Sequence, residues 1–170
     1  AFPFSETDTQ LNVENLKSKL YVQMTLATLK SFGISVHQSS DVFTIPGSQN
    51  YSASDYQIDG DWSSASCWLA ASALGYDISV QGLSLSSLQA DKQLLNAFLA
   101  ANCQVIHSEN GISIEGKNRK AFHFDATDCP DLFPALTVFA VLTEGESRIK
   151  GIHRLANKES DRASTLKSEF

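Results

Sequence analysis

The most constraining feature of this sequence is an internal repeat with a period of about 69 residues. Three pairs of segments carry it: Phe43–Gly47 over Ile112–Gly116, Ser79–Leu83 over Arg148–Ile152, and Gly75 over Gly145. A repeat of this length indicates one supersecondary unit that is used more than once. We therefore interpret the chain as copies of one unit rather than as a series of unrelated elements.

The hydrophobic periodicity predicts a mixed α/β fold. Apolar residues at helical spacing predict helices over residues 12–32, 63–74, 88–101, 132–142 and 163–170. Short alternating segments bounded by turn residues predict strands over residues 34–36, 42–45, 56–58, 78–80, 104–106, 112–114, 122–124 and 148–150. Each copy then runs helix, strand, strand, strand, helix, strand. This order differs from the alternation of dinucleotide-binding folds, and the glycine motifs of nucleotide sites are absent from the sequence.

Composition argues against several classes of partner. The 170 residues carry a formal net charge of −6, whereas nucleic acids and anionic membrane surfaces attract a positive field. The longest apolar run, residues 132–142, has eleven residues, and a membrane span needs about 20. Three cysteines without a C-x-x-C pair argue against a disulfide framework or a structural zinc site. We expect a cytoplasmic protein that binds neither nucleic acid nor membrane.

Five basic residues gather near the end of the sequence, at Arg148, Lys150, Arg154, Lys158 and Arg162. A local basic cluster in an acidic chain indicates a discrete anion site. If residues 153–162 are helical, Arg154, Lys158 and Arg162 share one face, where like charges repel unless an anion lies over them. The alternative is a solvated, charged helix start with Ser160 and Asp161 as a local cap.

A second cluster is acidic and precedes an apolar helix. Asp125, Asp128 and Asp131 follow one another at steps of three, and Pro130 stands before the last of them. One interpretation is an N-terminal cap favoured by the helix dipole. The other makes Asp131 a general base, which requires burial or a neighbour to raise its pKa. A metal site that also uses His123 would suit a hard ion, but the spacing matches no known motif.

A third segment combines small hydroxyl residues with a predicted helix start. Gly60-Asp-Trp-Ser-Ser-Ala-Ser66 could form a cradle for an anion or a phosphate, since free N–H groups point outward at a helix N-terminus. The alternative is an Asp or Ser cap followed by small residues that permit close helix packing. No serine has a histidine nearby in sequence, so a serine nucleophile has little support.

These three segments together resemble the 5-enolpyruvylshikimate-3-phosphate (EPSP) synthase family. LANKESDR (155–162), DCPD (128–131) and DGDWSSAS (59–66) are similar to its K-E-[ST]-D-R box, its D-x-P-D box and its G-D-x-S-S-A-S segment, in the same order. Residues 18–33 also resemble its S-K-x-Y…M-T-L…F-G helix. The K-E-S-D-R box is the specific part, because the related UDP-N-acetylglucosamine enolpyruvyl transferases share the fold without it.

The resemblance implies a two-lobed inverse α/β barrel built from repeated β-α-β-α-β-β units. It implies transfer of the enolpyruvyl group of phosphoenolpyruvate to the 5-hydroxyl of shikimate 3-phosphate, without metal or organic cofactor. We expect residues 1–83 to be the last unit of one lobe and residues 84–170 the first, partial unit of the other. The partners would be these two substrates and the remaining segments of the same enzyme, a monomer when intact. The 170 residues alone are expected to be inactive.

The resemblance also implies roles for single residues. Asp131 resembles the base that takes the 5-hydroxyl proton, and Lys158 would contact the shikimate hydroxyls and assist proton transfer. Glu159 would protonate the methylene carbon, and Arg162 would bind the carboxylate or phosphate of phosphoenolpyruvate. Ser64 would help to hold the 3-phosphate, and Arg154 occupies a substrate-contacting position. Cys67 departs from the family, since many members carry an aromatic residue there. The alternative function is a non-catalytic module of the same repeat type that holds a phosphorylated ligand.

Overall fold

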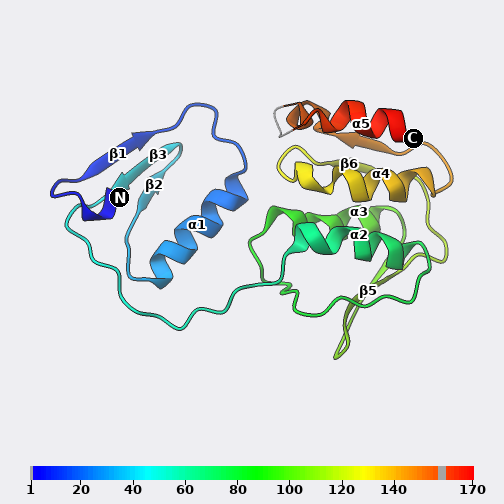
Figure 1. Cartoon of the computed structure of the whole chain (residues 1–170), viewed down its shortest axis with the longest axis horizontal. Helices are drawn as coiled ribbons and strands as arrows, with labels where there is room; N and C mark the ends of the chain where they lie inside the picture. The colour runs from blue at the N-terminus through cyan, green and yellow to red at the C-terminus, as the bar shows by residue number, and fades with distance from the viewer. Residues whose placement is uncertain (1, 157–159) are drawn as a thin grey trace. The chain divides into compact units, whose positions relative to one another are not determined.

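The computed structural model describes residues 2–156 and 160–170. The chain divides into two compact units, Ala1–Ile58 and Asp59–Phe170, which run from blue to cyan and from green to red in Figure 1. Residues 50–59, which lead from one to the other, are exposed and have no regular secondary structure. The expected lobe boundary between residues 83 and 84 therefore falls inside the second unit.

The first unit is a three-stranded antiparallel sheet with one helix. Its elements are η1 (Phe2–Phe4), β1 (Thr9–Asn12), α1 (Lys19–Ser31), β2 (His37–Ser39) and β3 (Val42–Ile45). β3 lies between β1 and β2, and Leu11 stands opposite Phe43. Phe43 and Ile45 alternate along β3 and are both buried. With Leu11, Leu26 and Leu29 they line an apolar groove of this unit.

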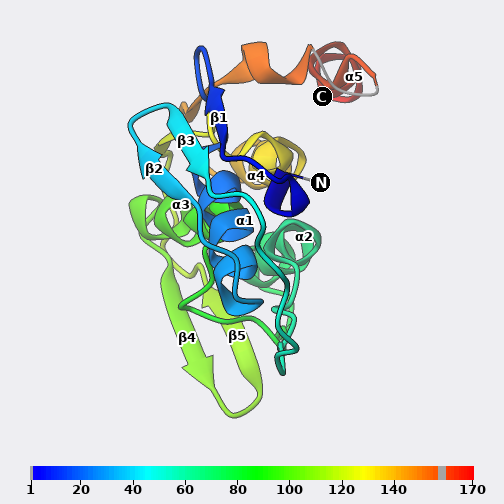
Figure 2. The same cartoon turned by 90° about the vertical axis from the view of Figure 1, so that its left-hand side faces the viewer.

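The second unit holds the remaining elements. Its helices are α2 (Trp62–Ala73), η2 (Ala90–Gln93), α3 (Leu94–Ala100), η3 (Pro130–Leu132), α4 (Phe133–Val141), η4 (Ile152–Leu155) and α5 (Arg162–Glu169). Its strands are β4 (Gln104–Ser108), β5 (Gly111–Glu115), β6 (His123–Asp125) and β7 (Arg148–Lys150). β4 and β5 form an antiparallel hairpin, seen in Figure 2. β6 and β7 are parallel and are connected through α4.

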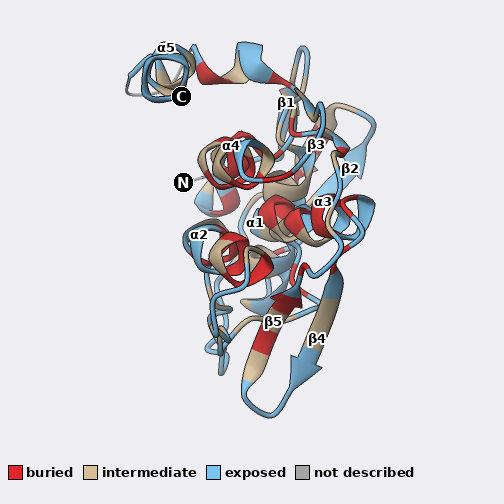
Figure 3. Cartoon of the chain, turned by 90° about the vertical axis from the view of Figure 1, so that its right-hand side faces the viewer, coloured by how far each residue is buried: buried red, intermediate tan, exposed pale blue. Residues whose placement is uncertain are grey.

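The core of the second unit lies where α2, α3 and α4 meet the strands. α2 contacts both α4 and β5, and α3 contacts β4 and β6. Trp62, Leu69, Phe98, Leu136 and Phe139 are fully buried, and Figure 3 shows the buried sides of these helices and of β5 in red. The rings of Phe98 and Phe139 meet edge to face with centroids 5.1 Å apart, a favourable arrangement for aromatic pairs.

Small residues on α2 allow this close packing. Ala65, Ala70 and Ala73 are buried. The hydroxyl of Ser72, also buried, accepts a hydrogen bond from the backbone N–H of Ile114 at 2.9 Å. A side chain at Gly116, just beyond β5, would collide with the backbone carbonyl of Ala73. The small residues of α2 therefore determine how closely β5 can approach this helix.

The structure supports the internal repeat at the level of the backbone. Gly75 and Gly145, which end the two equivalent helices, have φ angles of +106° and +99°. Gly82 and Gly151, which follow the next segment, have φ angles of +80° and +101°. Matching left-handed conformations at matching positions show that the two copies turn the chain in the same way.

Most predicted elements are confirmed to within a few residues, but several are wrong. The helix expected from residue 12 begins at Lys19, because Asn12 pairs with β3 and Asn15 and Ser18 have left-handed φ angles of +55° and +52°. Residues 34–36 and 56–58 are not strands, and Ile58 is 85% exposed. Residues 78–80 contribute one bridge, from Val80 to Ile112. The helix expected over residues 88–101 starts with the 3-10 turn η2 at Ala90.

Of the two interpretations of residues 153–162, the one that requires a single helix is wrong. Arg154 lies in the 3-10 turn η4, whereas Arg162 is the first residue of α5. The carboxylate of Asp161 accepts hydrogen bonds from the backbone N–H and the hydroxyl of Ser164, at 3.1 and 2.7 Å, and so starts a new helix. Asp161 is therefore the local cap of the alternative interpretation, and Arg154 and Arg162 do not share a helix face. Lys158 and Glu159 lie outside the described residues.

The methyl group that Gly116→Ala introduces must displace a helix carbonyl. We therefore expect this substitution to lower the free energy of unfolding of the second unit by about 2–3 kcal/mol. Gly75→Ala is the matched control, since no atom lies within 4 Å of the point that its β-carbon would occupy and only its φ of +106° opposes the change. That control should cost about 1 kcal/mol. Urea unfolding followed by the fluorescence of Trp62 and Trp68, both in α2, measures the difference. Equal losses would contradict the close contact.

Candidate functional site

The acidic segment forms the loop that leads from β6 into η3. The carboxylate of Asp125 accepts hydrogen bonds from the hydroxyl of Thr127 at 2.5 Å and from its backbone N–H at 3.0 Å. The hydroxyl bond, and after it the backbone bond, lowers the pKa of Asp125. Cys129 and Pro130 are buried at the start of η3. Asp125 therefore shapes the loop, and Asp131 stands in the first turn that follows it.

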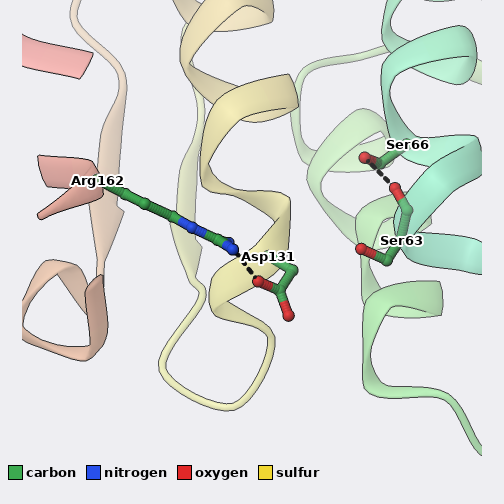
Figure 4. A network of polar contacts seen from close by, with 4 residues as sticks. All are labelled: Ser63, Ser66, Asp131 and Arg162. Atoms are coloured by element: carbon green, nitrogen blue, oxygen red, sulfur yellow. Dashed lines mark hydrogen bonds and ion pairs between the residues drawn. The ribbon is translucent and has the colours of Figure 1, made fainter. Parts of the chain in front are cut away.

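Asp131 and Arg162 meet in an ion pair. The Oδ1 atom of Asp131 lies 2.6 Å from Nη1 of Arg162, and Figure 4 shows the contact between η3 and α5. The side chains remain 32% and 33% exposed, respectively. A short bond between opposite charges is stronger than a neutral hydrogen bond. The structure thus brings together the residue predicted as a base and one of the residues predicted to bind an anion.

α2 contacts η3, the element that carries Asp131. Asp61 caps α2: its Oδ1 accepts from the backbone N–H of Ser63 at 2.9 Å, and its Oδ2 accepts from the hydroxyl of Ser64 at 2.6 Å. The Ser64 hydroxyl is the main cause of the lowered pKa of Asp61. The buried Ser66 donates to the carbonyl of Ser63 at 2.6 Å, as Figure 4 shows. The alternative interpretation, a cap followed by small packed residues, is therefore correct for Asp61.

Cys129 is an unreactive thiol, although it lies two residues before Asp131. Burial raises the pKa of its thiol to about 12, and the carboxylates of Asp91 and Asp128 act in the same direction. Because the thiolate is the reactive form, Cys129 stays a protonated thiol at neutral pH. The thiol therefore serves packing under η3 and does not act as a nucleophile.

The other predicted residues have different positions. Arg154 belongs to η4, which contacts η3. Ser64 is exposed on α2 and bonds to Asp61. Cys67 is exposed on the same helix. In the described part of the chain, no three His, Cys, Asp or Glu side chains come together as a possible cation site, so the metal alternative finds no support there.

One residue with a structural role at this site was not predicted. The side-chain amide of Gln89 bonds to Gly60 and to Trp62, which lie 29 and 27 residues away in the sequence. A glutamine in a Ser-rich connection carries no signal for such long-range partners. Only the local spacing of Asp61 before Ser63 and Ser64 could be recognised from the sequence.

Replacing the Ser64 hydroxyl tests the electrostatics of the α2 cap. We expect Ser64→Ala to raise the pKa of Asp61 toward 3.8, because the largest cause of the lowering is removed. The Asp61 cap stabilises the fold above the pKa that Asp61 has in the unfolded chain, and this stabilisation is lost as the pH falls through the lower pKa of the folded state. Ser64→Ala should make this pH-dependent contribution smaller. Titration of the Asp61 carboxyl carbon by NMR measures the shift. Ser66→Ala is the control, since Ser66 bonds to the carbonyl of Ser63; an equal shift in both variants would contradict the assignment.

Residues 1–170 match the family EPSP synthase (3-phosphoshikimate 1-carboxyvinyltransferase). A 3-phosphoshikimate 1-carboxyvinyltransferase of Brachyspira hyodysenteriae is 36% identical over 174 residues, which cover 100% of this chain and 41% of that protein. The enzyme of the same name from Clostridium acetobutylicum is 37% identical over 172 residues and is covered to 40%. The chain thus spans about 40% of the length of these relatives.

Solved structures agree with the fold. EPSP synthase from Acinetobacter baumannii matches with a TM-score of 0.76 at 20% identity, over 98% of this chain and 40% of that one. The enolpyruvyl transferase NikO from Streptomyces tendae matches with a TM-score of 0.63 at 16% identity, over 86% of this chain and 36% of that one. The family match over the whole sequence, the relatives above one-third identity and the shared fold lead to one conclusion: the chain belongs to the EPSP synthase family.

Proposed function

We propose that this chain is part of an enzyme that transfers the enolpyruvyl group of phosphoenolpyruvate to the 5-hydroxyl of shikimate 3-phosphate and releases phosphate. The support is membership of the family together with relatives that carry the name of this activity. Because the chain spans about 40% of the length of those relatives, we assign the activity to a longer protein that includes these residues.

The observation that carries the proposal is the ion pair between Asp131 and Arg162. The reaction needs a base for a hydroxyl proton and a cation for a phosphorylated carboxylic acid, and a carboxylate and a guanidinium lie 2.6 Å apart here. The pair supplies the positions of the two groups, whereas the base role of Asp131 is proposed from its place in the D-x-P-D motif. Their side chains remain about one-third exposed, so a ligand can reach them. An incoming anion would compete with the Asp131 carboxylate for Arg162.

The proposed reaction is an addition followed by an elimination. The Asp131 carboxylate takes the proton of the 5-hydroxyl as the oxygen bonds to C2 of phosphoenolpyruvate, and C3 gains a proton. Phosphate then leaves C2, and C3 returns a proton to the group that donated it, which forms the C2=C3 double bond of the enol ether product. Arg162 holds the carboxylate or phosphate of the donor through charge-assisted hydrogen bonds. Asp131 lies within η3, and Arg162 is the first residue of α5.

The remaining assignments follow the motif positions. We assign Lys158 to the shikimate hydroxyls and to proton transfer, and Glu159 to protonation of the methylene carbon. Ser64 is assigned to the 3-phosphate, for which its hydroxyl would have to leave Asp61, its present partner at 2.6 Å. Arg154, in η4 beside η3, is assigned to substrate contact.

Three further proposals concern the intact enzyme. The division of the chain into compact units at residues 58 and 59 supports a change of lobe near this point, earlier than residues 83 and 84.

All three cysteines are free thiols, which fits a reducing compartment such as the cytoplasm. We expect the intact enzyme to be a monomer. In the described part of the chain, no helix combines the length and apolar character needed to cross a membrane.

The assignment of Asp131 and Arg162 is tested in the full-length protein. Asp131→Ala should lower kcat by about 100-fold or more, as expected for loss of a general base. Arg162→Ala should raise KM for phosphoenolpyruvate at least about tenfold, or 1.4 kcal/mol. Asp128→Ala and Lys167→Ala remove exposed charges of the same sign from the same loop and the same helix, and serve as matched controls. Phosphate release is the assay.

If neither Asp131→Ala nor Arg162→Ala alters rate or binding by tenfold, the site assignment is wrong. The 170-residue chain alone should release no phosphate, and steady release from it would contradict the proposal that the activity needs the longer protein. Tight binding of shikimate 3-phosphate by the full-length protein without turnover would instead favour a non-catalytic module.

A further inference from the structure

The turn that begins α2 is attached to the connection before η2 by four hydrogen bonds. The backbone N–H of Gly60 donates to the carbonyl of Gly82 at 3.0 Å, and the indole N–H of Trp62 donates to the carbonyl of Ser84 at 3.3 Å. Gln89 makes the other two. Its Oε1 accepts from the backbone N–H of Trp62 at 2.9 Å, and its Nε2 donates to the carbonyl of Gly60 at 2.8 Å.

The side chain of Gln89 is chemically matched to this position. The first N–H groups of a helix have no partner inside the helix. Asp61 accepts from the second of them, on Ser63, and Gln89 accepts from the first, on Trp62. The carbonyl of Gly60, on the other side of Asp61, needs a donor. A neutral primary amide offers both functions at once, which a carboxylate or a hydrocarbon side chain of equal length does not.

The surroundings leave the turn little freedom. A β-carbon at Gly60 would lie 2.5 Å from the carbonyl oxygen of Gly82, and Trp62 is fully buried. Residues 50–59, which precede the turn, are exposed and have no regular structure. The amide of Gln89 therefore stands where the irregular connection ends and the packed unit begins.

This position connects Gln89 to the proposed active site. α2 presents Ser64 two residues after Trp62, and α2 contacts η3, the element that carries Asp131. We propose that Gln89 is a positioning residue, which fixes the N-terminal end of α2 and thereby the place of Ser64 relative to η3. The link to substrate rests on the proposed function, whereas the link to the geometry of α2 does not.

Hydrogen exchange in the 170-residue chain tests the geometry. Gln89→Met keeps the length of the side chain and removes both polar atoms. We expect the Trp62 amide to lose at least about tenfold in protection, equivalent to 1.4 kcal/mol. The Ile114 amide, bonded to the Ser72 hydroxyl, should keep its protection and so show that the core is intact. Gln89→Glu retains an acceptor for Trp62 but offers no donor to Gly60, and should give intermediate protection.

Kinetics in the full-length protein tests the link to substrate. Gln89→Met should raise KM for shikimate 3-phosphate about tenfold and change kcat less, because a displaced Ser64 affects binding of the 3-phosphate first. Gln81→Met, at an exposed glutamine of the same connection, is the matched control and should behave as the unmodified protein. The KM of Gln89→Glu should lie between those of Gln89→Met and Gln81→Met.

These measurements test the role of Gln89 in the turn separately from its role in positioning the site. Unchanged Trp62 protection in Gln89→Met would overturn the role of Gln89 in the turn. Lost protection with an unchanged KM would overturn its role in positioning the site and leave a purely structural bond. An inactive unmodified full-length protein would count against the proposed function and would leave the hydrogen-exchange result standing.

Discussion

The ion pair between Asp131 and Arg162 is the interaction on which the functional interpretation depends. A partly exposed pair of this kind contributes little to stability, typically about 1 kcal/mol or less. Its importance lies in position: it joins η3 to α5 across 31 residues of sequence with a 2.6 Å contact. In the proposed function, a ligand anion competes with the Asp131 carboxylate for this guanidinium.

The packing of α2 is what allows this site to form. Small buried residues let α2 approach both α4 and β5, and α2 also contacts η3, which carries Asp131. The helix N-terminus is already satisfied from within the chain, by the Asp61 carboxylate on one side and by the Gln89 amide on the other. An anion at the Ser64 hydroxyl would have to take the place of the Asp61 carboxylate, so we propose Arg162 as the more direct anion-binding group of the two.

The fold is predictable from the sequence where periodic apolar residues and glycines mark local structure. Residues 63–74 and the strand at 112–114 are recognised in this way, and the repeat predicts the matching backbone of Gly75 and Gly145. β1 escapes prediction because its pairing with β3 is a long-range contact without a local pattern. For residues 153–162 charge spacing favours one helix, whereas the cap residues Ser160 and Asp161 indicate a new helix start, and the structure has the second arrangement. Asp131 and Arg162 are found through motif resemblance, whereas the bonds of Gln89 depend on tertiary contacts alone.

Binding of inorganic phosphate to the 170-residue chain, followed by phosphorus NMR, tests most directly whether Asp131 and Arg162 form one anion site. Asp131→Asn removes the carboxylate that competes for Arg162, so phosphate should bind at least about threefold more tightly, or roughly 0.7 kcal/mol. Asp128→Asn removes the same charge from an exposed position three residues earlier and should have a smaller effect. Equal changes in the two variants, weaker binding by Asp131→Asn, or no phosphate binding by either would contradict the account.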